Sequence, residues 1–136
     1  MTWVPSLSDL ARYIIAFVVA SHGITYVMFP VLNGQIFVGW RESSWLLRST
    51  ITGDTLKTLT FALWVIAGVG FIATGTAIAL APSLQGLWPP LAMCASLVGL
   101  LSFAVIWDAQ IQHAVAQGII GAVISLIILI SAIVLR

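Results

Sequence analysis

Long apolar stretches separate a few charged positions along this chain. Residues 13–40, 58–107 and 109–135 contain no Asp, Glu, Lys or Arg, and these stretches are 28, 50 and 27 residues long. A transmembrane helix needs about 20 mainly apolar residues to cross about 30 Å of hydrocarbon. The first and third stretches therefore each fit one membrane span, and the middle stretch fits two spans joined by a tight turn.

The tight turn lies between Pro82 and Pro90, in the segment PSLQGLWPP. Proline ends a helix and glycine permits a turn, so one helix stops before this segment and another starts within it. The pattern predicts four antiparallel helices with both termini on the same side of the membrane. We place these helices at about 7–31, 56–81, 89–107 and 109–135.

Two short polar signals mark helix starts. Thr52, Gly53 and Asp54 form a start signal for the second helix. Asp108 lies between the third and fourth helices, where an aspartate can cap the N-terminus of the fourth.

Residues 32–55 form the one sizeable connection, and they are too apolar for a free linker. Residues 36–40 read IFVGW, and residues 45–47 read WLL beside charged positions. Such a mixture suits a structured segment in the headgroup layer. Either this loop folds onto the end of the bundle with Trp40 and Trp45 as interfacial anchors, or it forms a lid over a cavity.

Composition agrees with membrane insertion. Apolar residues make up 61% of the chain and charged residues 7%, whereas soluble domains have about 45–50% and about 25%. Nine charged side chains cannot cover a soluble globule. The composition excludes a soluble enzyme, a disordered chain and a nucleic-acid-binding protein, whose footprint is a dense basic patch. We expect one integral membrane domain over residues 1–136, in a bacterial inner membrane.

The basic residues give a weak asymmetry between the two sides. Arg41, Arg48 and Lys57 flank the loop, and Arg12 and Arg136 lie near the termini. Because Lys and Arg favour the cytoplasmic side, this distribution places the 32–55 loop in the cytoplasm.

Small residues recur at four-residue intervals in the predicted helices. Examples are Gly70-xxx-Thr74, Ala95-xxx-Gly99 and Ala114-xxx-Gly118. This pattern lets membrane helices approach closely. It predicts a tightly packed bundle, with a homodimer interface as the alternative.

Polar side chains form two clusters inside the predicted spans. One face of the first helix carries His22, Thr25, Tyr26 and Phe29. A stripe on the predicted fourth helix carries Gln110, His113, Gln117, Gly121 and Ser125. Both clusters point to the same end of the bundle, because the first helix ends there and the fourth begins there. Polar groups inside a bilayer usually face the bundle interior or a cavity.

Three interpretations of these clusters stay open. The two histidines can simply be satisfied polar residues. They can instead line a pocket for a quinone or a lipid headgroup, because a quinone carbonyl needs hydrogen-bond donors at the edge of an apolar slot. In the third interpretation His22 and His113 ligate a metal centre, either a bis-histidine haem or a chlorophyll magnesium. The candidate ligand-binding residues of the second interpretation are His22, Tyr26, Gln110, His113 and Gln117.

Three short motifs resemble those of small four-helix bacterial membrane proteins of the DoxX-like family. They are ARYIIAF at residues 11–17, SHG at residues 21–23 and WDA at residues 107–109. The resemblance implies a four-helix bundle and, for some members, an association with quinone-linked oxidation. It also implies that Arg12, His22, Gly23 and Asp108 are the positions of this chain that correspond to residues shared by the family.

These observations favour a non-catalytic role over an enzyme. We expect a small accessory or structural subunit of a larger membrane complex involved in redox chemistry, surrounded by lipids and holding a quinone or lipid near one face. No catalytic residue is assigned. One alternative is a free-standing quinone-linked or haem-binding oxidoreductase component. Another is a small transporter that works as a homo-oligomer.

Overall fold

The computed structural model describes residues 7–32, 44–47, 50–80, 83–84, 86–115 and 118–135. These residues form an all-α fold. Its helices are α1 (Leu7–Leu32), α2 (Gly53–Ala79), α3 (Trp88–Ile106) and α4 (Ile119–Val134), and a short 3-10 helix, η1 (Ile111–His113), precedes α4.

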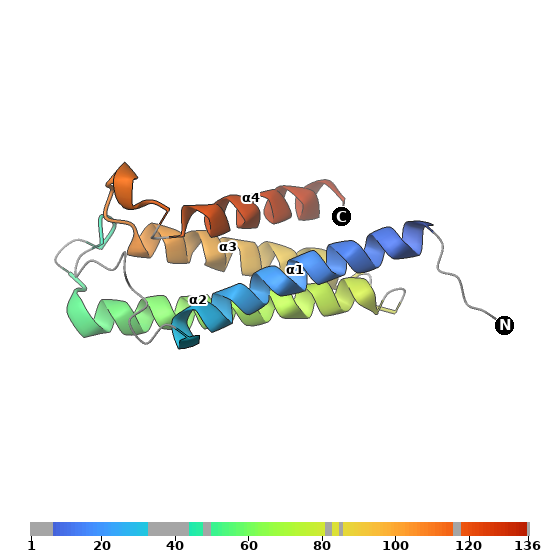
Figure 1. The fold of residues 1–136 in the computed structure, drawn as a ribbon, viewed down its shortest axis with the longest axis horizontal. Coiled ribbons are helices and arrows are strands. Elements are labelled where there is room, and N and C mark those ends of the chain that lie inside the picture. Colours follow the sequence, from blue (N-terminus) through green and yellow to red (C-terminus); the bar gives the residue numbers. More distant parts are fainter. Residues whose placement is uncertain are drawn as a thin grey trace.

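Consecutive helices pack against one another in antiparallel order, α1 on α2, α2 on α3 and α3 on α4 (Figure 1). The first turn of α1 and the last turn of α4 lie at the same end of the bundle (Figure 1). We call the opposite end, where α1 finishes and α2 and α4 begin, the loop end. The predicted antiparallel four-helix bundle is confirmed.

Three helices are long and apolar enough to cross a membrane. They provide the segments Ser8–Met28, Gly53–Ala79 and Trp88–Ile106. Large apolar side chains on their outer faces are exposed, including Phe17, Ile66 and Leu97. Contiguous apolar surface of this extent is rare on soluble monomers and matches a lipid environment. The fold therefore indicates an integral membrane protein.

The fourth helix is shorter than the predicted range 109–135. It begins at Ile119 and contains 16 residues, which span about 24 Å at 1.5 Å per residue. The reason lies in the preceding backbone: Ala109 has φ 65° and Gly118 has φ 96°. Both angles are in the left-handed region, which an α-helix cannot contain. The chain therefore turns twice before α4 starts.

Asp108 does not cap the fourth helix, contrary to the prediction. One carboxylate oxygen accepts a hydrogen bond from the backbone N–H of Gln110 at 3.0 Å. The other lies 2.7 Å from Nδ1 of His113. Asp108 therefore holds the turn that contains η1, and the residue at the N-cap of α4 is Gly118.

The second helix begins at Gly53, so the start signal at residues 52–54 is confirmed and the predicted start at 56 is three residues late. Much of the predicted loop, Trp40 included, lies outside the described residues. Trp45 donates its backbone N–H to the carbonyl of Trp107 at 3.0 Å, and the two indole rings are 5.9 Å apart. This part of the loop therefore folds onto the end of α3.

Small residues set the distance between the helices. A Cβ atom on Gly23 of α1 would lie 2.5 Å from the carbonyl oxygen of Gly68 on α2, and one on Gly70 would lie 2.8 Å from Cβ of Ala95 on α3. The prediction of close packing is confirmed at these contacts. It is wrong for Ala114-xxx-Gly118, because both residues precede α4.

Candidate functional site

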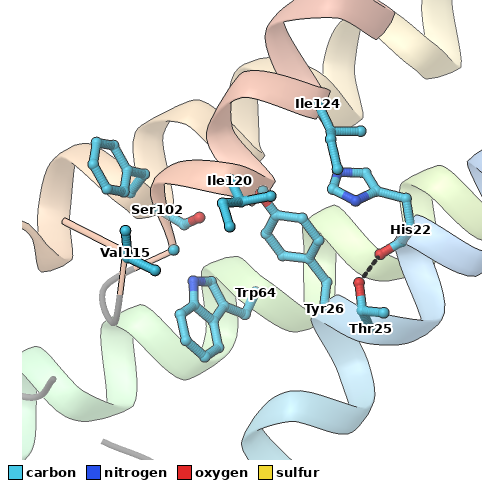
Figure 2. A pocket seen from close by; sticks show the side chains of 11 residues that line it. His22, Thr25, Tyr26, Trp64, Ser102, Val115, Ile120 and Ile124 are labelled. Carbon is cyan, nitrogen blue, oxygen red and sulfur yellow. Dashed lines mark hydrogen bonds between the residues drawn. The ribbon is translucent and has the colours of Figure 1, made fainter. Parts of the chain in front are cut away.

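A cavity of about 340 Å³ lies among the four helices, toward the loop end. Side chains from α1, α2, α3 and α4 surround it (Figure 2). Its lining consists of His22, Thr25, Tyr26, Trp64, Ser102, Phe103, Val115, Gly118, Ile120, Gly121 and Ile124. A cavity of this size is within the usual range of about 300–1,000 Å³ for small-molecule sites.

The first helix directs His22 and Tyr26 toward the cavity. The two residues are four positions apart and share one face of α1, so their rings meet edge to face with centroids 5.0 Å apart. Phe71 of α2 lies behind both, with its ring 4.7 Å from the imidazole and 5.8 Å from the phenol. The prediction that His22 and Tyr26 share one face of the first helix is confirmed, and the fully buried ring of Phe71 packs against both.

Ser125 of α4 joins both side chains to a second helix beside the cavity. Its hydroxyl oxygen lies 3.2 Å from Nε2 of His22 and 3.2 Å from the hydroxyl of Tyr26. Ser125 is fully buried. The extensive helix contacts join consecutive helices only, so these two hydrogen bonds connect α1 to α4 beside the cavity.

Two glycines leave room for the phenol of Tyr26. A Cβ atom on Gly99 of α3 would lie 3.0 Å from the Tyr26 hydroxyl, and one on Gly121 of α4 would lie 3.4 Å from it. A larger side chain at Gly99 would also meet the hydroxyl of Ser125 at 2.9 Å. The position of the phenol therefore depends on these small residues.

Two further hydroxyl groups in the lining use their protons within their own helices. Thr25 donates to the carbonyl of His22, and Ser102 donates to the carbonyl of Gly99, both at 2.7 Å. A hydroxyl has one proton and two lone pairs. In this arrangement the oxygens of Thr25 and Ser102 can act toward the cavity only as acceptors.

The rest of the lining is apolar. Trp64 of α2 is buried, and Phe103, Val115, Ile120 and Ile124 contribute aromatic and aliphatic surface. Among the described lining residues there is no Asp, Glu, Lys or Arg. The cavity can therefore hold an apolar molecule and offer a few uncharged hydrogen-bonding groups at one side.

Sequence reasoning missed Trp64 and Ser102 as lining residues. Trp64 lies in the middle of a span, away from the helix ends where interfacial tryptophans occur. This unusual position was the one sequence feature that could have indicated a role in the site. Ser102 is three residues after Gly99, which belongs to the small-residue pattern of α3. Ser125 was part of the predicted polar stripe, although its role as a bridge depends on how α1 and α4 lie across the cavity.

The other predicted site residues are elsewhere. Gln110 and His113 are not among the residues that line the cavity. His113 pairs with Asp108, and the side chain of Gln110 accepts a hydrogen bond from Gln112 at 2.9 Å. They leave the predicted stripe because residues 110–113 precede α4. Gln117 lies outside the described residues.

The two histidines are oriented by different elements. Ser125 of α4 holds the imidazole of His22, Asp108 of the preceding turn holds that of His113, and only His22 lines the cavity. In the part of the chain that the structure describes, no three His, Cys, Asp or Glu side chains are grouped as metal ligands. The two histidines therefore do not line a common cavity.

No family model matches this chain, and no curated protein and no solved structure matches it. The resemblance to DoxX-like proteins stays a prediction.

Proposed function

We propose that this chain is an integral membrane subunit that holds a quinone or a neutral lipid in the cavity beside His22 and Tyr26. One observation carries the proposal, namely a cavity of about 340 Å³ with an apolar lining and a hydrogen-bonded group of His22, Tyr26 and Ser125 at one side. A ligand with a polar headgroup and an apolar tail needs this combination of surfaces.

The depth of the cavity supports the same proposal. His22 is ten residues before the end of α1 at Leu32, which corresponds to about 15 Å along the helix axis. If α1 spans the bilayer, the imidazole lies near its middle, and Tyr26 lies one turn closer to the loop end. A ligand at this depth enters from the lipid phase.

We favour binding without chemistry by the chain itself. The described lining residues include no carboxylate, lysine or cysteine, and the titratable side chains among them, His22 and Tyr26, are both hydrogen-bonded to Ser125. We therefore favour an accessory role in a larger membrane redox assembly, with the loop end on the cytoplasmic side. The free-standing oxidoreductase component and the oligomeric transporter remain the alternatives.

Ligand retention tests the proposal. The protein is purified in mild detergent, extracted with organic solvent and analysed for quinones and lipids by mass spectrometry. We expect a co-purified neutral ligand whose amount falls about three- to ten-fold in His22→Ala and in Tyr26→Phe, because each substitution removes a hydrogen bond of about 1 kcal/mol. The accessory role predicts that the same preparation co-migrates with larger proteins on native gels.

Matched controls separate the cavity from general effects. His113→Ala removes the histidine that lies outside the cavity, and Tyr13→Phe removes an exposed tyrosine hydroxyl of the same helix. Both variants should retain the ligand. Equal retention in the cavity variants and the controls would contradict the proposed site, and a lone monomer on native gels would contradict the accessory role.

A further inference from the structure

The cavity has a closed side. The lining residues that α2 and α3 contribute are Trp64, Ser102 and Phe103, and none of the three is exposed. His22 of α1, which also lines the cavity, is buried as well. We call these four residues the floor. A ligand therefore cannot reach the cavity past the floor without moving packed side chains.

The cavity also has an open side. The exposed residues among its described lining are Thr25 of α1, Val115 of the turn before α4, and Ile120 of α4. Val115 is 68% and Ile120 is 61% exposed. A residue that lines a cavity and is also exposed marks the place where the cavity meets the exterior. We call these three residues the rim, and they place the opening between α1 and α4.

The packing of the helices explains why the opening is there. Extensive contacts join consecutive helices only, and α1 and α4 diverge toward the loop end (Figure 1). The hydrogen bonds of Ser125 connect these two helices. Ser125 is five residues after Ile120 on α4, which corresponds to about 7.5 Å along the helix axis. Between Ser125 and the loop end, no extensive contact between α1 and α4 closes the cavity.

The chemistry of the rim suits hydrocarbon. Val115 and Ile120 are aliphatic, and Thr25 donates its hydroxyl proton to a carbonyl of its own helix at 2.7 Å. Exposed side chains close in sequence to the rim, Ile24 of α1 and Val123 of α4, are aliphatic too. Thr25 is seven residues before the end of α1, about 10.5 Å along the helix axis. If α1 spans the bilayer, the opening therefore faces lipid.

Floor and rim together give the cavity a direction. The hydrogen-bonded group of His22, Tyr26 and Ser125 is at the buried side, and the aliphatic rim is at the exposed side. We propose that a bound amphiphile keeps its polar group beside His22 and Tyr26 and extends its hydrocarbon tail between α1 and α4 into the bilayer, and that it enters by this opening. The inference rests on the proposed function, because it adds the orientation and the entry route of the same ligand.

Reversible blocking of the rim tests the entry route. Ile120→Cys in a Cys94→Ser background is modified with a bulky, apolar methanethiosulfonate, and intact mass confirms the modification. Quenching of tryptophan fluorescence reports the binding of a fully ring-substituted benzoquinone with a decyl tail. The association rate should fall at least about ten-fold after modification, because the attached group fills the opening and must move before the ligand enters. Removing the group with dithiothreitol, followed by desalting, should restore the rate and shows that the protein stayed folded.

Val123→Cys in the same background is the matched control. Val123 is exposed on the same helix but does not line the cavity, so its modification should leave the association rate unchanged. An unchanged rate after modification at position 120, or an equal loss at both positions, would overturn the entry route and leave the proposed function intact. If the wild-type protein does not bind the benzoquinone, a quinone as ligand of the proposed function is overturned together with this inference.

Photo-crosslinking tests the orientation in the wild-type protein. The same benzoquinone carries a diazirine at the end of the tail that is next to the ring, and peptide mass spectrometry locates the adducts after irradiation. We expect adducts on α1 or α4 that an excess of the plain benzoquinone prevents. Adducts confined to α2 and α3, or adducts that persist in the excess, would overturn the proposed position of the tail.

Discussion

Ser125 shows how one small polar residue can organise a membrane site. Its hydroxyl is the shared partner of His22 and Tyr26. The phenol of Tyr26 lies against Gly99 and Gly121, where an added Cβ atom would be 3.0 Å and 3.4 Å from its hydroxyl. Within lipid, interhelical hydrogen bonds contribute modestly, about 0.6 kcal/mol on average. Two such bonds at one residue still connect helices that have little other contact.

Replacing Ser125 by alanine should therefore loosen α4 from α1. The substitution removes both hydrogen bonds while leaving the volume nearly unchanged. We expect a loss of about 1–2 kcal/mol in the free energy of unfolding, measured by denaturant titration in mixed micelles. Ser131→Ala is the matched control, because Ser131 lies on the same helix and bonds to its own helix at the carbonyl of Ile127. Equal stability of the two variants would show that the bridge does not contribute.

At the scale of helices, backbone contact between α1 and α2 positions the site. Gly23 and Gly68 lie against each other's backbone, which brings His22, the residue before Gly23, over Phe71. Sequence alone reveals the small residues, but it does not tell which of them face a partner helix, because glycines also occur on lipid-facing surfaces and in turns.

Gly23→Ala should separate these helices. Alanine is favoured over glycine within a helix by about 1 kcal/mol. The added Cβ atom, however, would lie 2.5 Å from the carbonyl oxygen of Gly68 and 2.8 Å from the backbone nitrogen of Ile72. Backbone atoms cannot move aside as a flexible side chain can, and overpacking costs about 1–3 kcal/mol. We expect net destabilisation in thermal unfolding and weaker ligand retention.

Gly86→Ala provides the comparison, because no atom lies within 4 Å of the added Cβ atom at that turn. It should unfold at the wild-type temperature. A Gly23→Ala protein with unchanged stability would mean that α1 and α2 lie farther apart than in this structure.

At the scale of the whole molecule, the outer surface determines the environment. Exposed apolar side chains occur on all four helices, and three helices have the length and hydropathy of membrane spans. The shorter α4 rests on α3, and its N-terminal end is reached through the turn held by Asp108. The cavity lies beside that end, so the start of α4 contributes to its wall.

Chemical labelling of Cys94 tests this arrangement. The thiol lies on the outer face of α3, six residues after Trp88 and therefore about 9 Å along the helix. A membrane-impermeant maleimide should label it at least about ten-fold more slowly in membranes than after solubilisation in SDS, because the polar reagent does not enter the hydrocarbon that surrounds the thiol. Rapid labelling in intact membranes would contradict a lipid-facing α3.

A cysteine placed at the exposed turn serves as the control for labelling. Gly86→Cys in a Cys94→Ser background should react readily in permeabilised membranes, since Gly86 is exposed at the end of the bundle. The contrast between the two positions then reports depth within the membrane.

The sequence by itself determined the class of this protein and the order of its helices. Charge-free stretches of 28, 50 and 27 residues require burial in lipid, and the prolines between Pro82 and Pro90 require a turn. The pairing of His22 with Tyr26 was also predictable, because residues four apart share a helix face. These features depend on local composition and periodicity.

Only the tertiary structure decided the composition of the site. Left-handed backbone at Ala109 and Gly118 ends the apparent periodicity of the fourth helix, so His113 and Gln110 leave the predicted stripe while Ser125 remains on α4. Trp64 and Ser102 line the same cavity as His22, and Ser125 is hydrogen-bonded to it, because helices that are distant in sequence pack together. Such contacts depend on how closely the backbones approach, which a pattern within one segment does not encode.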